Sequence, residues 1–92
     1  GEEFAIVLPD TRLAHAVRIA DRLRQALAAR WAHAGLSALT ASAGVASAPQ
    51  NSPYRPDQLV AAADRALYAA KAAGRNRTVP ASPAPADPAG AS

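Results

Sequence analysis

The stretch "GEEFAIVLPDT" (residues 1–11) sets the order of the first two structural elements. Residues 4–8 are continuously apolar and include Ile6 and Val7, a composition typical of a strand buried on both faces. Asp10 or Thr11 can then cap the free backbone N–H groups at the start of a helix. We therefore expect a buried strand that leads directly into a helix.

The segment that follows is strongly helical. Apolar residues recur at three- and four-residue steps over residues 12–31 and form one stripe: Leu13, Ala16, Val17, Ala20, Leu23, Leu27 and Trp31. Gly35 marks the exit from this helix. Residues 39–46, "LTASAGVA", are predicted to form a second strand, in which Gly44 indicates a bulge or a close neighbouring backbone.

A loop and a second helix complete the pattern. The three prolines of residues 49–56 disfavour both helix and sheet. Asp57 is expected at the cap of a helix that buries a stripe of Val60, Ala63, Leu67 and Ala70 and ends at Gly74. Residues 75–79 can add a short edge strand. The order strand–helix–strand–helix–short strand predicts an α/β fold, with helices packed on a sheet that is small and incomplete.

Length and composition limit the possible classes of protein. The 92 residues fit one small domain, and the absence of cysteine rules out disulfides and Cys-ligated zinc. No apolar run approaches the roughly 20 residues that span a bilayer, and the amino terminus lacks the pattern of a signal peptide. We therefore expect a cytoplasmic domain, whose parent protein could still be tethered to a membrane.

The two ends of the sequence carry separate expectations. The chain contains no methionine, so Gly1 is not a translation start, and we interpret the sequence as a fragment or a processed product. Residues 80–92, "PASPAPADPAGAS", contain four prolines and almost no apolar bulk. Such a segment cannot offset the entropy of ordering, so we expect a disordered tail there.

Two groups of residues could carry chemistry. Glu2 and Glu3 lie at the end of the first strand, where a carboxylate can hold a hard cation such as magnesium, and Gly1 would let a phosphate approach the backbone. An ordinary acidic turn is the alternative. Lys71 lies in the last turn of the second helix and Arg75 just beyond it, so the two could straddle a polyphosphate. The helix dipole also favours cations there, by about 0.3–1 kcal/mol.

Other features favour structural roles. The net charge of +3, with nine arginines and a single lysine, could favour an anionic ligand, but dispersed charges of this kind usually serve solubility. The remaining polar and aromatic candidates are interpreted as solvated or packed residues: His15, His33, Asp64, Ser42, Trp31 and Tyr68. There is no P-loop and no basic patch rich in aromatics, so we expect no nucleic-acid partner.

Taken together, the sequence segments that contain these two groups resemble the catalytic GGDEF domain of diguanylate cyclases. These enzymes condense two GTP molecules into cyclic di-GMP. "GEEF" is similar to the last four letters of the signature GG[D/E]EF, and "ADRALYAAKAAGRNR" (residues 63–77) closely matches the hallmark AD.ALY.AK..GRN. "LPDT", "ADRLRQAL" and "LTASAGVAS" resemble the segments between them. The resemblance covers about residues 1–79, as the C-terminal part of a palm-like α+β domain of the nucleotidyl-cyclase type.

The resemblance implies a role for each matching position. Glu2 would bind Mg²⁺ (or Mn²⁺) and help to deprotonate the attacking 3′-hydroxyl, and Glu3 would be required for activity. Gly1, Lys71 and Arg75 would contact the GTP phosphates. Such roles suit nucleotidyl transfer, in which the protein mainly positions groups and neutralises charge.

The chain also departs from the family pattern. The first glycine of the signature is absent, as are the upstream metal-binding aspartate, the guanine-reading residues and the Arg-x-x-Asp inhibition motif. Arg22 matches a secondary contact for inhibitory cyclic di-GMP in some members, although an exposed helix arginine is the simpler reading. We therefore expect the isolated chain to be catalytically inert and poorly folded.

Because each domain would present one GTP, the resemblance further implies a homodimer. An upstream sensory or dimerisation module would bring the two domains together. Two alternatives stay open. In one, the parent is a degenerate GGDEF domain that binds GTP or cyclic di-GMP and regulates a partner. In the other, the chain is a truncated fragment without a catalytic role.

Overall fold

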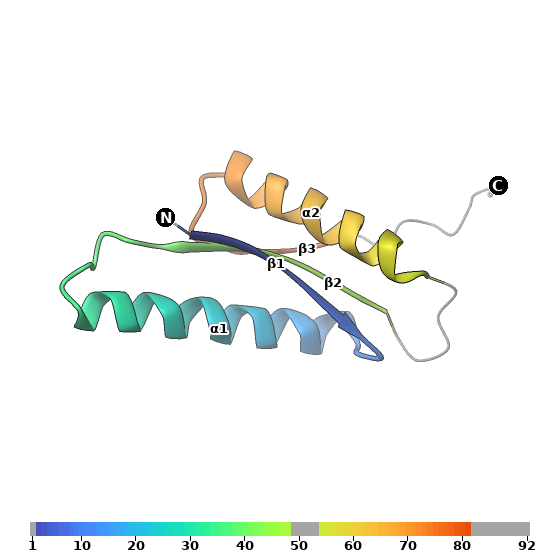
Figure 1. Cartoon of the computed structure of the whole chain (residues 1–92), viewed down its shortest axis with the longest axis horizontal. Coiled ribbons are helices and arrows are strands. Elements are labelled where there is room, and N and C mark those ends of the chain that lie inside the picture. The colour runs from blue at the N-terminus through green and yellow to red at the C-terminus, as the bar shows by residue number, and fades with distance from the viewer. Residues whose placement is uncertain (1, 49–53, 82–92) are drawn as a thin grey trace.

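The computed structural model describes residues 2–48 and 54–81. Within them the chain forms β1 (Glu2–Pro9), α1 (Leu13–His33), β2 (Ala41–Ala48), α2 (Pro56–Ala72) and β3 (Thr78–Pro80) (Figure 1). The three strands make one parallel sheet in the order β1-β2-β3. The predicted α/β fold and the predicted order of elements are confirmed.

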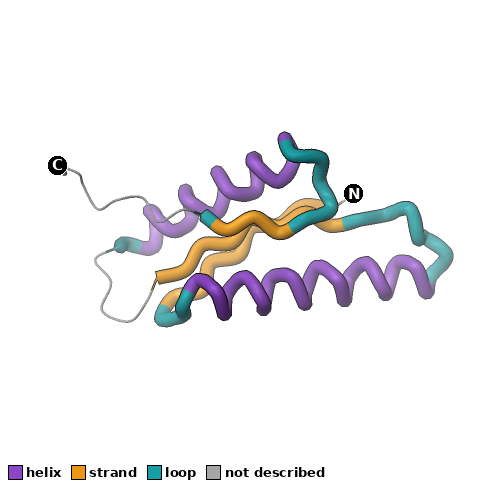
Figure 2. Tube along the Cα trace, turned by 180° about the vertical axis from the view of Figure 1, so that it is seen from behind, coloured by secondary structure: helices purple, strands orange, loops and turns teal. Residues whose placement is uncertain are grey.

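The two helices lie on opposite faces of this sheet, which Figure 2 shows from behind. Val45 of β2 packs with Ala16 of α1, whereas the next residue, Ala46, packs with Ala63 of α2. Successive residues of a strand point to opposite faces, so β2 is covered from both sides. Accordingly, every residue of β2 is buried except Ser47, which is half-buried.

The connections between the strands are unusual. The strands follow chain order and run parallel, yet α1 and α2 cover opposite faces. The β1–α1–β2 and β2–α2–β3 crossovers therefore have opposite hands. Because about 98% of such crossovers are right-handed, one of the two is an exception to the rule.

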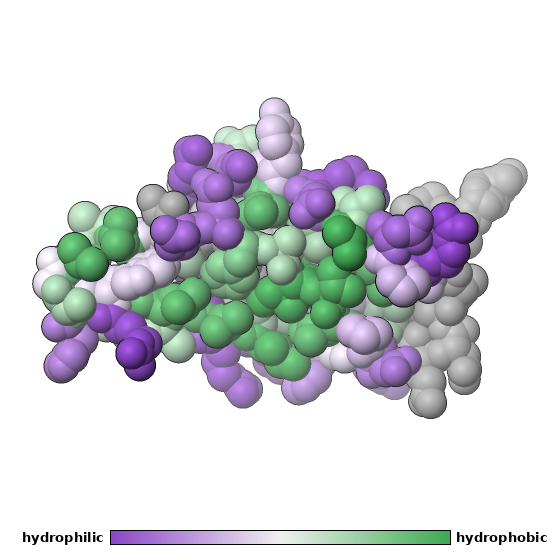
Figure 3. Space-filling view, viewed as in Figure 1, coloured by the Kyte–Doolittle hydropathy of each residue, from purple (hydrophilic) through white to green (hydrophobic). Residues whose placement is uncertain are grey.

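The prediction of a first strand buried on both faces is wrong. β1 pairs with β2 alone in the described sheet, and none of its residues is fully buried. Ala5 is exposed, and Phe4 and Ile6 are half-buried, because both helices pack mainly on β2. Figure 3 shows the result as a band of hydrophobic residues between the two helices.

Gly44 sets the distance between β2 and α2. A Cβ atom at this position would lie 2.7 Å from the Cα of Leu67 and nearer still to backbone atoms of Leu67 and Ala63. Any side chain would push the helix away from the strand. The prediction of a close neighbouring backbone is confirmed, whereas the unbroken register between β1 and β2 excludes a bulge.

The start of α1 differs from the prediction, and its end agrees. Its N-cap residue is Arg12, which makes no side-chain cap. The hydroxyl of Thr11 donates instead to the carbonyl of Pro9 at 2.8 Å, and Asp10 adopts a positive φ of 54°. Gly35, with a φ of 84°, follows the helix as expected.

The start of α2 is also shifted. Arg55 is its N-cap residue, and the backbone N–H of Arg55 donates to Oε1 of Gln58 at 2.8 Å. Asp57 therefore lies in the first turn and not at the cap. At the other end Gly74, with a φ of 118°, terminates the helix as predicted.

The buried stripes of both helices contain one error each. Val60 of α2 and Leu23 of α1 were expected in the core, but they are 50% and 45% exposed. The residues that α2 buries are Leu59, Ala62, Ala63, Ala66 and Ala70. The core is thus built largely from alanine, which lets the helices lie close to the strands.

The predicted third strand forms, but it begins at Thr78, three residues later than expected, because Arg75 and Asn76 form a left-handed turn. The chain continues past β3 to Ala81, whose N–H donates to the carbonyl of Val45 at 2.7 Å. Of the expected tail, Pro80 is therefore the last residue of β3, and Ala81 is hydrogen-bonded to β2. Residues 82–92 lie outside the described residues, so the tail stays a prediction. Neither described helix is long and apolar enough to cross a membrane.

Candidate functional site

Glu3, Lys71 and Arg75 meet at one end of the molecule, where β1 begins and α2 ends. The Nζ atom of Lys71 lies 3.5 Å from Oε1 of Glu3, and Nε of Arg75 lies 3.6 Å from Oε2. One carboxylate therefore bridges both cations. The acidic start of the chain and the basic end of the second helix, which the sequence singled out separately, form one cluster.

Glu2 is not part of this cluster. The register pairs Glu2 with Ala41 and Glu3 with Ser42, so the two acids point to opposite faces of the sheet. Glu2 is exposed, and no ion pair joins it to Lys71 within the described residues. Glu3, and not Glu2, thus converges with the two cations.

The carboxylates of the described residues are of a type that magnesium binds, but they do not form a complete metal site. Mg²⁺ commonly binds one or two carboxylates and completes its shell with waters and substrate phosphates. Residues 2–48 and 54–81 contain no group of three or more His, Cys, Asp or Glu that could hold a metal. Glu2, whose carboxylate has no ion pair there, fits as one ligand of such an ion. Gly1 lies outside the described residues.

A left-handed turn presents Arg75. Gly74, Arg75 and Asn76 have φ angles of 118°, 64° and 51°. A left-handed residue other than glycine costs roughly 1–2 kcal/mol, so the turn needs support. The N–H of Arg75 donates to the carbonyl of Ala70 at 2.8 Å, and the N–H of Asn76 donates to Oγ of Ser42 at 3.0 Å. The turn is therefore tied to both α2 and β2.

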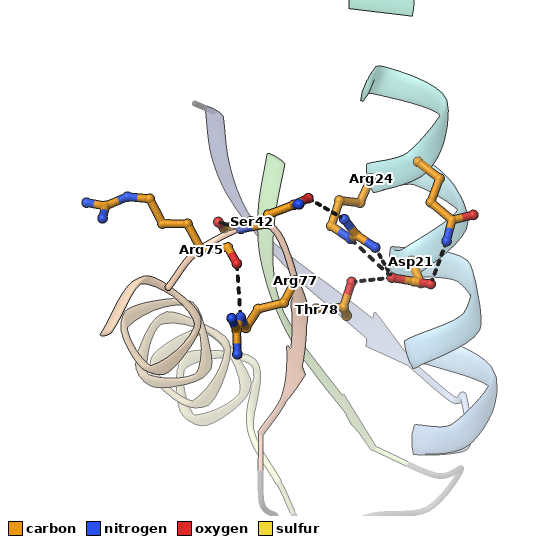
Figure 4. A network of polar contacts seen from close by, with 8 residues as sticks. Asp21, Arg24, Ser42, Arg75, Arg77 and Thr78 are labelled. Carbon is orange, nitrogen blue, oxygen red and sulfur yellow. Dashed lines mark hydrogen bonds and ion pairs between the residues drawn. The ribbon is translucent and has the colours of Figure 1, made fainter. Parts of the chain in front are cut away.

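A polar network connects the same turn to α1 and β3 (Figure 4). Arg24 donates to Oδ1 of Asp21 at 2.9 Å and to Oδ1 of Asn76 at 2.9 Å, and the Thr78 hydroxyl donates to Oδ1 of Asp21 at 3.0 Å. The bonds from Arg24 and then Thr78 hold the pKa of the Asp21 carboxyl below its ordinary value. Figure 4 shows the side chain of Arg75 pointing away from this network, so the network holds the backbone of the turn and the guanidinium can pair with Glu3.

The sequence interpretation missed this support. Ser42 was read as an ordinary strand residue, but it is 1% exposed and is the buried polar residue of the described core. A serine on the α2-facing side of an otherwise apolar strand was the available signal, since buried hydroxyls are almost always hydrogen-bonded. Nothing in the sequence of α1 distinguished Asp21 and Arg24 from other exposed charges.

The lesser candidates make none of the ion pairs of the cluster. Tyr68 is 72% exposed, so the prediction that it packs is wrong, whereas Trp31 is half-buried. Arg22 is exposed on α1, as its simpler reading requires. A shallow cavity of about 500 Å³ near the end of α1 is lined by Ala29, Arg30, His33 and Ala34, and no residue of the cluster lines it.

Comparison with known proteins identifies the family. The family model described as "Diguanylate cyclase, GGDEF domain" matches residues 1–77. Response regulator PleD of Caulobacter vibrioides is 42% identical over 83 residues, which cover 86% of this chain and 18% of that protein. Diguanylate cyclase DgcM of Escherichia coli is 41% identical over 79 residues, with the same coverage of each chain.

A third relative, the uncharacterized protein YhcK of Bacillus subtilis, is 40% identical over 80 residues and is covered over 22% of its length. The chain thus spans about a fifth of the length of these curated relatives. No solved structure matches it significantly. The family match spans most of the chain and includes both the acidic and the basic ends of the cluster, so this chain belongs to the GGDEF family of diguanylate cyclase domains.

Proposed function

We propose that residues 1–79 are the C-terminal part of a GGDEF domain that, when complete, condenses two GTP molecules into cyclic di-GMP. The 3′-oxygen of each GTP forms a bond to the α-phosphorus of the other, and pyrophosphate leaves. The observation that carries the proposal is that Lys71 and Arg75 converge on Glu3, which is a residue of the GG[D/E]EF signature. A pair of cations at one end of a helix is suited to a triphosphate.

Lys71 and Arg75 are the proposed phosphate-binding residues. Their side chains are 36% and 58% exposed, so a nucleotide can reach both from solvent. Lysine supplies a point charge, and the guanidinium supplies a fork of donors. Together with Gly1, they would orient the triphosphate and neutralise the charge that develops on its oxygens. Glu3 contacts both cations and is proposed to be required for activity.

Glu2 is the proposed ligand of Mg²⁺ (or Mn²⁺). It lies on the other face of the strand from Glu3, outside the ion pairs, and its oxygens are of the kind these cations prefer. The ion would polarise phosphate oxygens of the bound nucleotide. Glu2 is also proposed to help remove the proton of the attacking 3′-hydroxyl.

The remaining features concern the parent protein. Because each domain presents one GTP, we propose a homodimer in which two sites face each other, assembled by an upstream sensory or dimerisation module. The chain covers only a small share of each relative, and PleD is described as a response regulator. Both observations support further modules in the parent protein. We also propose a cytoplasmic location, a disordered tail beyond the sheet, and Arg22 as a contact for inhibitory cyclic di-GMP.

The test is a chimera in which residues 1–79 replace the matching segment of DgcM, hereafter the DgcM chimera. Incubated with GTP and Mg²⁺, the DgcM chimera should form cyclic di-GMP, and Glu2→Gln should abolish that product. The isolated 92-residue chain should form none. A folded chimera that binds GTP without forming cyclic di-GMP would contradict the proposal and favour a degenerate regulatory domain.

A further inference from the structure

We infer that Glu3 is an internal competitor for the phosphate-binding pair: its carboxylate holds Lys71 and Arg75 in the nucleotide-free chain and must release them when a polyphosphate binds. The inference rests on the proposed function, because it takes these two cations as the phosphate-binding residues. It adds a specificity role to Glu3. An anion gains access to the pair only if it binds the two cations better than this carboxylate does.

The geometry of the cluster is that of a weak contact. Strong charge-assisted hydrogen bonds are about 2.7–2.9 Å long, whereas the two nitrogen–oxygen distances here are 3.5 and 3.6 Å. The side chains of all three residues are also at least 32% exposed. Exposed ion pairs of this kind contribute little stability, so a phosphate that makes short hydrogen bonds can displace the carboxylate.

The backbone nevertheless keeps Glu3 beside the cations. Glu3 is paired with Ser42 in the sheet register, and the Ser42 hydroxyl accepts a hydrogen bond from Asn76, the residue after Arg75. The strand and the cationic turn are therefore fixed to each other at this point. A carboxylate held in this way competes at a high effective concentration, however weak each of its contacts is.

The two adjacent acids consequently have different relations to a bound anion. Glu3 would repel phosphate oxygens that take its place on the cations, because its backbone stays beside them. Glu2 points to the other face of the sheet and does not compete. Removing the charge of Glu3 should therefore raise the affinity for a metal-free polyphosphate, which is a gain that misfolding cannot produce.

The experiment is calorimetric titration of the DgcM chimera with sodium tripolyphosphate, without divalent cations and at low salt. Its Glu3→Gln variant should bind about three- to tenfold more tightly than the unchanged chimera, the range expected when two exposed ion pairs no longer compete. Asp64→Asn removes the same charge from α2 at an exposed position and should change the affinity less than twofold. An affinity of Glu3→Gln that is unchanged, weaker, or no higher than that of Asp64→Asn overturns the inference.

Two further variants locate the effect. Replacing Lys71 and Arg75 by alanine in the Glu3→Gln background should abolish the gain, and a gain that survives this change overturns the inference. If the unchanged chimera binds tripolyphosphate through Lys71 and Arg75 and its Glu3→Gln variant binds no better, only the competitor role fails. If neither protein binds tripolyphosphate, the proposed phosphate site fails with it.

Discussion

Arg24 of α1 donates a hydrogen bond from Nη1 to Oδ1 of Asn76 at 2.9 Å, across 52 positions of sequence. Asp21 orients the guanidinium by accepting from Nε at 3.1 Å and from Nη2 at 2.9 Å. Asn76 adjoins Arg75 in the left-handed turn. The position of α1 is thereby linked to the turn that carries one of the proposed phosphate-binding residues.

Replacing Arg24 by alanine should loosen this turn. A hydrogen bond to a charged group is worth about 1.5–3 kcal/mol, so exchange of the Asn76 amide should accelerate roughly tenfold or more. Hydrogen exchange measured by NMR in the DgcM chimera tests this. Arg22→Ala, two residues earlier and exposed, is the matched control. Equal protection of Asn76 in both variants would show that the network does not hold the turn.

Asp21 should make the stability depend on pH at the acid end. Its folded pKa lies below the ordinary value of 3.8, so the stabilisation is present above that pH and is lost as the pH falls through the lower folded value. The carboxylate is 39% exposed, which keeps the effect small, at about 1 kcal/mol. The difference in unfolding free energy between the DgcM chimera and its Asp21→Asn variant should thus be constant above about pH 5 and shrink below pH 4.

Urea unfolding at several pH values gives this difference directly. Asp57→Asn is the control, because Asp57 is 71% exposed and pairs with Arg55 at the surface. It should show no comparable loss. A difference for Asp21→Asn that grows as the pH falls would reverse the expected sign and refute the assignment of the network.

Gly44→Ala should destabilise the fold strongly. The added Cβ would meet the backbone of α2 at Leu67 and Ala63, which cannot move as a flexible side chain can. Overpacking typically costs about 1–3 kcal/mol, and contact with backbone places this case at the upper end. Gly35→Ala has open space around it and a φ of 84°, so it should cost only about 1 kcal/mol of backbone strain. Equal unfolding free energies of the two variants would count against the close approach of β2 and α2.

Leu59 and Val60 offer a paired test of the α2 stripe. Leu59 is 8% exposed and Val60 is 50% exposed. Leu59→Ala should lower the unfolding free energy of the DgcM chimera by about 2–4 kcal/mol, and Val60→Ala by less than about 1 kcal/mol. Urea denaturation measures both. The reverse ranking would mean that α2 is rotated relative to the described structure.

The same helix shows that the sequence pattern predicts the extent of a helix but not which of its faces is buried. The spacing of apolar residues and the terminal glycine predicted α2 to within a few residues. Its many alanines, however, make several arcs of the helix equally apolar, so the sequence could not choose between Leu59 and Val60. The choice depends on which arc fits against Gly44 and the small residues of β2, and that is a tertiary contact.

The sequence predicted the types of residue that form the site but not their arrangement in space. The matching motifs predicted Lys71 and Arg75 as phosphate contacts and Glu2 as the metal ligand, whereas the structure brings Glu3 to the two cations. The opposite faces of Glu2 and Glu3 follow from the two-residue period of a strand, but the acids were placed at the end of the strand instead of within it. The hydrogen bonds of Ser42 and Arg24 join distant segments, so no local pattern encodes them.

Whether Lys71 belongs to a triphosphate site is tested by the rate of cyclic di-GMP formation by the DgcM chimera and its Lys71→Ala variant. Loss of one charged contact to phosphate should lower kcat/KM for GTP at least about tenfold. Arg65→Ala removes the same charge from an exposed position of α2 and should leave kcat/KM within about twofold. A Lys71→Ala variant as active as the Arg65→Ala variant would show that Lys71 does not hold the triphosphate.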